Sequence, residues 1–343
     1  MVKVAVNGIG TIGKRAAEAV KDQDDMELVA LSDVSQTGGL RTVLKEEGPL
    51  HGTPLYASNE EGREELESKG FHVEGLFEDL LESGEVDVVI DSTPPGVDKA
   101  NKENLYEPNG VKAIFQGGAD PDIAPVAFNA DANYSDARGE DFAKVVSCNT
   151  TSLSRTMSAV DEAFGVDKAI ANLVRRGGDI PQDGRGPINS TIPVTEVPSH
   201  HGPDVQAVMP ELDITTLAVK VPVTYGHVHM VNADLEKDVS EEDVLNSFEE
   251  QPRVDLIQAD HGYDSTGKVH EMMRDLERNR SDMQEAGVWR ETVTVDDGTV
   301  YWLHMVHQES IVIPDNVDAI RAMFEMESKE ESIRKTNDAM GIE

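Results

Sequence analysis

Cys148 is the only cysteine in this chain of 343 residues, and polar side chains surround it in the run from Ser147 to Thr151. The thiol follows the apolar pair Val145-Val146, where a strand is predicted to pass into a helix. Unpaired backbone N–H groups and the positive end of the helix dipole would favour the thiolate there, which is the nucleophilic form. The sequence therefore predicts a nucleophile. The alternative is an inert packed thiol, because free cysteines are usually buried.

Two pairs of histidines could supply further chemistry. His227 and His229 lie two residues apart in a predicted strand, so their rings share one face. One of them could take the proton of the thiol and stabilise the thiolate as an imidazolium. His200 and His201 lie in the turn-rich segment 198–203, whose donors could hold an anion. Both pairs could instead be structural, or bind zinc. We expect no metal, because the spacing matches no standard zinc module.

Paired arginines follow an apolar run. Arg175 and Arg176 come directly after the predicted strand 169–174 in a chain with few basic residues, which suggests an anion nearby. Gly177 and Gly178 would allow the backbone to approach that anion closely. The alternative is surface ion pairing with the abundant carboxylates.

A glycine-rich loop opens the chain. Gly8, Gly10 and Gly13 follow the predicted strand 2–6, and apolar residues then recur every fourth position over 12–20, as in an amphipathic helix. Gly8 would permit a tight turn, Gly10 would let N–H groups approach a pyrophosphate, and Gly13 would allow close packing of helix on strand. This order of strand, loop and helix predicts a dinucleotide site.

An acidic residue ends the next predicted strand, 26–31. Asp33 lies about 20 residues beyond the loop, where a carboxylate accepts hydrogen bonds from the adenosine ribose. A carboxylate there repels a 2′-phosphate, so Asp33 favours NAD over NADP. Lys14 and Arg15 could still screen a phosphate, and Asp33 could also be an ordinary loop acid.

The remaining pattern sets the fold class. A helix over 76–81 and strands over 86–90 and 111–115 continue an alternation typical of a doubly wound parallel sheet, whose loops 91–96 and 116–118 would line a ligand crevice. Longer strand-like runs follow Thr151. We therefore expect an α/β protein with a Rossmann-type sheet and a second, α+β catalytic domain with a mixed sheet. The runs in that second part are 169–174, 215–221 and 227–233.

Composition limits the class of protein. Hydrophobic residues make up 38% of the chain, enough for two domains with cores. No apolar run approaches the roughly 20 residues of a membrane span. A predicted strand begins at once, without the charged segment and apolar core of a signal peptide, so we expect a cytoplasmic protein. A single cysteine excludes a disulfide within the chain.

The charge is strongly negative. There are 66 acidic and 30 basic residues, which give a formal net charge of −36. Such a surface repels nucleic acid and anionic membranes, so neither is an expected partner. The self-repulsion is tolerable mainly in high salt, where the Debye length falls to about 3 Å at molar ionic strength. Because the acidic residues are spread along the chain, we expect a salt-adapted, halophilic source.

Several motifs resemble those of the archaeal-type (class II) phosphorylating glyceraldehyde-3-phosphate dehydrogenases. The resemblance runs from residue 1 to the final helix. Its most specific parts are Ser-Cys-Asn-Thr-Thr from Ser147 and Pro-Ser-His-His-Gly-Pro-Asp from Pro198. The matching segments are 7–13, 115–118, 145–151, 174–177, 186–189, 198–204, 227–229, 288–291 and 306–310.

The resemblance implies a reaction. Cys148 would attack the aldehyde of D-glyceraldehyde 3-phosphate to form a thiohemiacetal, and His227 would be the base that assists departure of the hydride to NAD or NADP. Inorganic phosphate would then cleave the thioester to give 1,3-bisphosphoglycerate, in glycolysis or, reversed, in gluconeogenesis. Asn149 and the N–H groups of its helix would stabilise the oxyanion.

The resemblance also implies binding residues. Those that would contact the substrate or its phosphates are Ser147, Asn149, Thr150, Thr151, Arg175, His200 and His201. Those that would contact the cofactor, besides Gly8, Gly10, Gly13 and Asp33, are Thr11, Ile12, Gly118, Arg176 and Gln308. The chain departs from many relatives at Ser32-Asp33-Val34, where they carry Lys-Thr, and this puts use of NADP in doubt.

The architecture of the family implies the domains. A long helix over 314–326, starting after Asp315, would return to the nucleotide domain. We expect a dinucleotide-binding domain over 1–147 and 312–343 and a catalytic domain over 148–311. The family assembles as a homotetramer.

Two other functions remain open. A semialdehyde dehydrogenase of similar layout would carry a carboxylate-binding arginine in place of the paired-histidine loop. A non-catalytic nucleotide-binding regulator would use the glycine loop to sense the redox state and would only pack Cys148.

Overall fold

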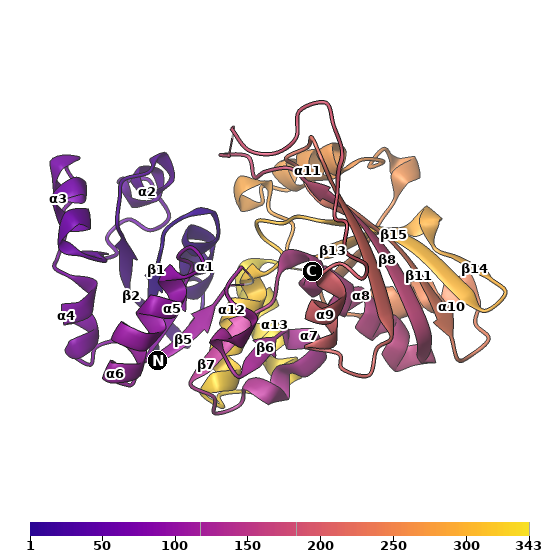
Figure 1. The fold of residues 1–343 in the computed structure, drawn as a ribbon, viewed down its shortest axis with the longest axis horizontal. Helices are drawn as coiled ribbons and strands as arrows, with labels where there is room; N and C mark the ends of the chain where they lie inside the picture. The colour runs from indigo at the N-terminus through magenta and orange to yellow at the C-terminus, as the bar shows by residue number, and fades with distance from the viewer. Residues whose placement is uncertain (117, 183, 343) are drawn as a thin grey trace. The chain divides into compact units, whose positions relative to one another are not determined.

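The computed structural model describes residues 1–116, 118–182 and 184–342, and the chain forms two compact units (Figure 1). The first unit comprises Met1–Ala130, Tyr134–Ser147 and Ile313–Glu343, and the second comprises Asp131–Asn133 and Cys148–Val312. Gly117, in the predicted loop 116–118, lies outside the described residues.

The first unit is built on a parallel sheet, as expected. Its order is β3-β2-β1-β4-β5-β7-β6. The chain starts in the middle, moves outward to one side and then crosses to the other at β4, so the carboxyl ends of β1 and β4 flank the point where the order reverses. The strands are β1 (Val2–Asn7), β2 (Met26–Asp33), β3 (Leu55–Ala57), β4 (Val88–Asp91), β5 (Lys112–Phe115), β6 (Val126–Phe128) and β7 (Phe142–Val145).

Helices cover this sheet. The predicted amphipathic helix is α1, whose residues Ala16 and Val20 are fully buried. The predicted helix over 76–81 is confirmed as α4. The helices between strands are α1 (Thr11–Lys21), α2 (Gly38–Leu44), α3 (Glu60–Ser68), α4 (Phe77–Glu82), α5 (Val97–Asn101) and α6 (Glu107–Asn109). A further helix, α7 (Ala130–Asn133), starts in this unit, but its residues Asp131–Asn133 belong to the second.

The glycine loop leaves no room for side chains at two of its three glycines. A Cβ on Gly13 would lie 1.9 Å from the carbonyl oxygen of Gly8. Gly8 has φ +88°, and its Cβ would lie 3.0 Å from the backbone of Ser92. Nothing lies within 4 Å of a Cβ on Gly10. The loop is therefore packed tightly against β1 and β4 while its outer side at Gly10 stays open.

Two helices at the end of the chain complete the first unit. They are α12 (Ile313–Met323) and α13 (Lys329–Met340). The predicted start after Asp315 is wrong, because α12 begins at Ile313. Asp315 does not cap this helix from outside: its carboxylate accepts hydrogen bonds from Asn129 Nδ2 at 3.1 Å and from the backbone N–H of Ala130 at 2.8 Å.

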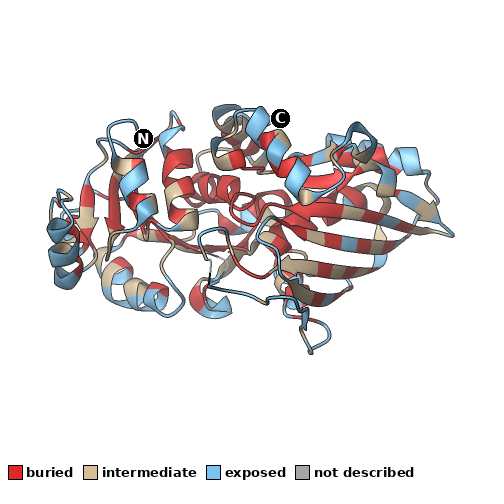
Figure 2. Cartoon of the chain, turned by 90° about the horizontal axis from the view of Figure 1, so that it is seen from above, coloured by how far each residue is buried: buried red, intermediate tan, exposed pale blue. Residues whose placement is uncertain are grey.

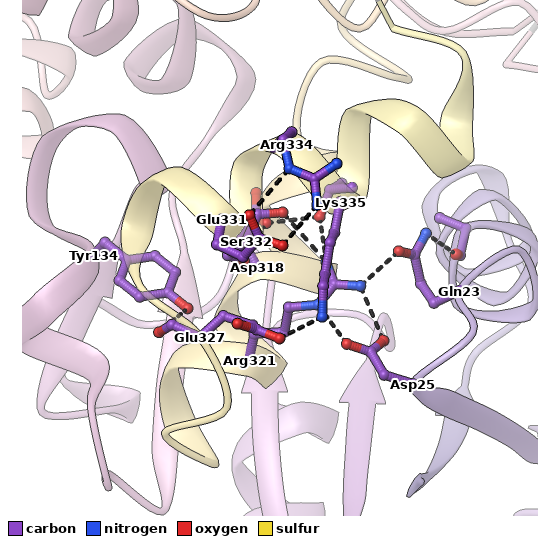
Figure 3. Close-up of polar contacts among 12 residues, drawn as sticks. Gln23, Asp25, Tyr134, Asp318, Arg321, Glu327, Glu331, Ser332, Arg334 and Lys335 are labelled. Atoms are coloured by element: carbon purple, nitrogen blue, oxygen red, sulfur yellow. Dashed lines mark hydrogen bonds and ion pairs between the residues drawn. The ribbon is translucent and has the colours of Figure 1, made fainter.

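A buried arginine fastens these helices to the sheet (Figure 3). Arg321 is fully buried and donates to both carboxylate oxygens of Asp25, at 2.8 and 2.9 Å, just before β2. It also donates to Gln23 Oε1 at 2.8 Å and to Thr336 Oγ1 of α13 at 2.6 Å. A guanidinium supplies these donors in a fixed plane, so one side chain joins α12, α13 and the start of β2.

The second unit contains the expected mixed sheet, in the order β12-β13-β15-β11-β8-β10-β9 with β14 paired to β15. β8 and β10 run parallel, whereas β11 is antiparallel to both β8 and β15. The strands are β8 (Val166–Arg176), β9 (Ile192–Pro193), β10 (Ile214–Val221), β11 (His227–Leu235), β12 (Val254–Ile257), β13 (Ala286–Trp289), β14 (Thr294–Asp296) and β15 (Thr299–Val306). The helices are α8 (Cys148–Phe164), α9 (His201–Gln206), α10 (Glu241–Glu250) and α11 (Thr266–Asp275).

The strands of this sheet bury alternate residues, which Figure 2 shows along their length. His227 and His229 point to the buried face, and His229 lies directly opposite His304 of β15. Met230 points to the other face, where it is 39% exposed. Within the described part of the chain, none of the helices combines the length and apolarity needed to span a bilayer.

Substitution of Gly13 tests the packing of the loop. Gly13→Ala should destabilise the protein by about 1–3 kcal/mol or more, because the added methyl overlaps a backbone oxygen that cannot move freely. Gly10→Ala is the matched control and should change stability by less than about 0.5 kcal/mol, because it meets open space. Urea unfolding of both variants measures this, and equal losses would contradict the packing argument.

Candidate active site

Cys148 is the first residue of α8, as the sequence predicted, and the preceding strand β7 ends three residues earlier. Its position does not give the expected low pKa. Burial raises the pKa of the Cys148 thiol, while the nearby charges of Arg176 and Arg175 lower it and Asp179 raises it. The helix start therefore does not by itself produce a thiolate, and a base is needed.

The two arginines are the last residues of β8. Arg176 donates from Nε to Asp179 Oδ1 at 2.7 Å, and Gln308 Nε2 donates to the same oxygen at 3.3 Å. Asp179 therefore links Arg176 and Gln308, the two residues of the second unit that were predicted to bind the cofactor. Arg175 differs, because its buried Nε has no partner among the described residues. Ion pairing with a carboxylate, the alternative for this pair, thus applies to Arg176.

Asn149 lies between the two histidines of β11. Its Oδ1 is 2.6 Å from His227 Nδ1 and 3.0 Å from His229 Nε2. All three side chains are buried. His227 Nε2 has no partner in the described part of the chain. Burial, followed by the charges of Arg176 and Arg175, lowers the pKa of His227 well below its usual value, so its ring is neutral.

The second histidine pair lies where a short helix begins. The segment was expected to be a loop, but His201 is the first residue of α9, held against β10 by a hydrogen bond of 2.8 Å between the hydroxyls of Ser199 and Thr216. Both ring nitrogens of buried His201 lack partners among the described residues. Burial, Arg175 and His200 together lower the pKa of His201 to about 2.

Two of these unsatisfied groups interact electrostatically, because the charge of Arg175 acts on His201. Besides Arg175 Nε and His201, the buried hydroxyl of Thr151 in α8 has no partner among the described residues. Buried polar groups normally have one. A set of donors next to a guanidinium fits an anion such as phosphate.

A metal ion is the other possible occupant. Ligand atoms of His200, His201 and Asp204 lie within 4.8 Å of one another. The positive charge of Arg175, which already lowers the pKa of His201, would also repel a cation. The electrostatics thus favour an anion over a metal at this cluster.

The other predicted residues lie at the carboxyl ends of strands in the first unit. Gly8, Gly10, Thr11, Ile12 and Gly13 form the loop and the first turn of α1. Asp33 ends β2, and its carboxylate accepts from the N–H of Ile9 at 2.9 Å and of Val34 at 2.7 Å. Gly118 is exposed after β5, and Ser147 is the residue after which the chain passes from this unit into the second. The open side of the loop, at the N-terminus of α1, fits a pyrophosphate.

Known proteins match this chain along its whole length. A family model described as glyceraldehyde 3-phosphate dehydrogenase, C-terminal domain, matches residues 147–284. A relative named glyceraldehyde-3-phosphate dehydrogenase from Thermococcus kodakarensis is 48% identical, and one of the same name from Pyrococcus abyssi is 49% identical, each over 99% of both chains. Another from Methanobacterium bryantii is 46% identical over 100% of both chains. The chain belongs to the archaeal-type glyceraldehyde-3-phosphate dehydrogenase family.

In this member of the glyceraldehyde-3-phosphate dehydrogenase family, three residues contact the predicted site residues but were not predicted from the sequence. Asp179 holds Arg176 and Gln308. Trp302 Nε1 donates to His304 Nδ1 at 3.1 Å, and His304 Nε2 lies 3.0 Å from His229 Nδ1. Trp302 and His304 are two residues apart in a strand, the same spacing as the predicted pair in β11. That spacing was the available signal, but only the pairing of β11 with β15 brings the two pairs together.

The charge of Arg176 should set the reactivity of the thiol. Alkylation of Cys148 by iodoacetamide should rise with pH to a midpoint above about 8.5, the ordinary value for cysteine. Arg176→Met should raise the pKa further, because it removes an attraction for the thiolate, and so slow alkylation at pH 7 several-fold. Arg176→Lys keeps the charge and is the control. Alkylation in Arg176→Met at the unaltered rate would contradict this electrostatic account.

Proposed function

We propose that this protein catalyses the phosphorylating oxidation of D-glyceraldehyde 3-phosphate to 1,3-bisphosphoglycerate, and the reverse reaction, with hydride transfer to NAD or NADP. One observation carries the proposal: Cys148 starts α8, and the next residue, Asn149, holds His227, whose Nε2 has no partner among the residues that the structure describes. Membership of the family and the printed names of its relatives support the same activity.

The proposed chemistry begins with the thiol. The proton of Cys148 passes to His227 Nε2, the sulfur forms a bond to the aldehyde carbon, and His227 returns the proton to the aldehyde oxygen, giving a thiohemiacetal. NAD or NADP, held at the glycine loop, would supply the acceptor for the hydride of that carbon, and His227 would take the hydroxyl proton. An oxygen of inorganic phosphate then attacks the resulting thioester carbonyl, and the carbon–sulfur bond breaks to release the acyl phosphate and regenerate Cys148. N–H groups at the start of α8 would stabilise the oxyanions.

Anion binding would also adjust the base. Burial and, after it, repulsion by Arg176 and Arg175 lower the pKa of His227. A phosphate held by Arg175 and His201 would offset part of that charge and raise the pKa, so that the imidazole becomes a stronger base when substrate is present. We assign binding of the substrate and phosphate to Arg175 and His201 together with Ser147, Asn149, Thr150, Thr151 and His200.

We assign cofactor binding and the domains in the same way. Residues 1–147 and 312–343 form the dinucleotide-binding domain, and 148–311 form the catalytic domain. The tight packing at Gly13 and the open side at Gly10 support pyrophosphate binding at the loop. The cofactor residues would be Gly8, Gly10, Thr11, Ile12, Gly13, Asp33, Gly118, Arg176 and Gln308. Asp33 would favour NAD.

The proposal extends to environment and assembly. The charge of −36 supports a salt-adapted protein, and a cytoplasmic location remains our expectation. A homotetramer is expected, and an exposed apolar row on the outer face of the second sheet supports association of copies. Leu217 of β10, 40% exposed, and Met230 of β11, 39% exposed, flank Asn172 in this row.

The decisive assay uses purified protein with D-glyceraldehyde 3-phosphate, NAD or NADP, and phosphate or arsenate, in dilute buffer and in molar KCl. Absorbance of the reduced nicotinamide should appear, faster in high salt. Cys148→Ser should lower kcat by at least about 10³-fold, because the hydroxyl is a far weaker nucleophile, and His227→Asn should lower it roughly 10²–10⁴-fold.

A semialdehyde substrate is the control aldehyde in that assay. Turnover of aspartate semialdehyde with no turnover of glyceraldehyde 3-phosphate would overturn the proposed substrate. Binding of NAD without oxidation of either aldehyde would point to the regulator instead.

Asp33 should set the choice of cofactor. Asp33→Asn keeps an oxygen for the N–H of Ile9 but removes the negative charge. We expect the ratio of kcat/KM with NADP to that with NAD to rise about tenfold or more, because the 2′-phosphate is no longer repelled. Asp24→Asn, an exposed acid in the turn before β2, is the matched control for net charge. An unchanged ratio in Asp33→Asn would contradict the role of this carboxylate.

A further inference from the structure

A line of five buried side chains connects β15 to α8 through the second unit. Trp302 Nε1 lies 3.1 Å from His304 Nδ1, and His304 Nε2 lies 3.0 Å from His229 Nδ1. His229 Nε2 is 3.0 Å and His227 Nδ1 is 2.6 Å from Asn149 Oδ1. Each of the five is at most 2% exposed. The line ends at His227 Nε2, which has no partner among the described residues.

The direction of every hydrogen bond in this line follows from its first member. An indole N–H can only donate, so His304 Nδ1 must be the acceptor and carry no proton. A ring without a proton on Nδ1 carries one on Nε2, so His304 donates to His229 Nδ1. By the same reasoning His229 carries its proton on Nε2 and donates to Asn149. The group of Asn149 that faces the histidines must therefore be the carbonyl oxygen.

The last step fixes His227. An amide oxygen has two lone pairs and no proton, so it accepts from His229 and from His227 together. His227 must then carry its proton on Nδ1, and in a neutral ring this leaves the lone pair on Nε2. Burial lowers the pKa of His304 to about 3, and burial also lowers the pKa of His229 and His227 well below the usual value, which is consistent with neutral rings throughout.

We propose that Trp302, acting through His304 and His229, is a positioning residue that fixes the orientation of Asn149 and the tautomer of His227, so that His227 Nε2 is always the proton acceptor. The role of that acceptor as the catalytic base rests on the proposed function, but the tautomer does not. With its oxygen occupied by the two histidines, Asn149 keeps only Nδ2 as a donor toward substrate.

The fold makes this line rigid. Trp302 and His304 alternate along β15 and share its buried face, and the register places His304 directly opposite His229. Ser152, one turn along α8 from Asn149, donates its hydroxyl to the backbone carbonyl oxygen of Asn149 at 3.0 Å, and the same hydroxyl lies 3.3 Å from His229 Nδ1. A hydroxyl can donate or accept, so its contact with His229 Nδ1 is compatible with the tautomer that Trp302 sets and does not itself fix the tautomer.

Without the indole N–H the line loses its direction. His304 could then carry its proton on either nitrogen, and the reversed chain would present His229 Nε2 as an acceptor. Asn149 would turn its Nδ2 toward the histidines, and His227 would carry its proton on Nε2. A fraction of molecules would thus hold a base that cannot accept a proton.

The test is Trp302→Phe, which removes the N–H and keeps an aromatic ring. Trp289→Phe is the matched control, because the other tryptophan of the chain donates to the Tyr263 carbonyl at 2.8 Å, outside this line. ¹⁵N NMR spectra of the full-length protein labelled at histidine report which ring nitrogens are protonated. The His227 signals are assigned from their absence in His227→Asn.

We expect one His227 tautomer, protonated on Nδ1, in the native protein and in Trp289→Phe, and a mixture of two tautomers in Trp302→Phe. The kcat of Trp302→Phe should fall roughly tenfold, part of the 10²–10⁴-fold that a general base contributes, with KM for the triose phosphate within about twofold. A single Nδ1-protonated tautomer and native kcat in a folded Trp302→Phe would overturn the proposal.

A second pair of variants decides the matter if Trp302→Phe fails to fold. In His304→Gln the carboxamide offers one acceptor and one donor, as neutral histidine does, so it should keep the tautomer of His227 and most of kcat. His304→Leu should lose both the single tautomer of His227 and most of kcat. Equal spectra and equal kcat in these two variants would also overturn the proposal. If the native protein oxidises no triose phosphate, the proposed function fails, while the spectra still test the tautomer.

Discussion

The site depends on one carbonyl oxygen that accepts two hydrogen bonds. Asn149 Oδ1 lies within 3.0 Å of a nitrogen of both His227 and His229, and Asn149 directly follows Cys148 in the chain. The helix that carries the proposed nucleophile therefore also orients the proposed base. Because Asn149, His227 and His229 are buried away from water, the ring nitrogens that face Asn149 find their partner in its oxygen, and this fixes the arrangement.

The charges around this oxygen favour association with an anion. Burial raises the pKa of Cys148 and lowers that of His227, so both are neutral without substrate. The neighbouring arginines attract the thiolate and repel the imidazolium, and a bound phosphate would weaken the second effect. Arg175 and Arg176 act in a chain with a formal charge of −36, which shows that local positive potential does not depend on net charge.

Much of the architecture was predictable from the sequence. Apolar runs with turn residues between them gave the strands of the parallel sheet, and the glycine spacing gave the loop, because both depend on neighbours in the chain. The predicted start of α12 was wrong, because Asp315 accepts hydrogen bonds from Asn129 and Ala130, which lie nearly two hundred residues away in the chain. The loop expected at His201 is the start of a helix for a similar reason: contacts with β10 decide its conformation.

The sequence by itself determined which residues we propose for the chemistry: one cysteine next to Asn149, and a histidine pair that alternation places on one face of a strand. Only the tertiary structure decided their protonation. The pKa of Cys148 depends on burial and on the charges of Arg176 and Arg175 at the end of β8. The tautomer of His227 depends on Trp302, whose hydrogen bonds connect to it because β15 pairs with β11. Protonation follows from which groups face each other in space, and sequence spacing does not specify partners that lie on different strands.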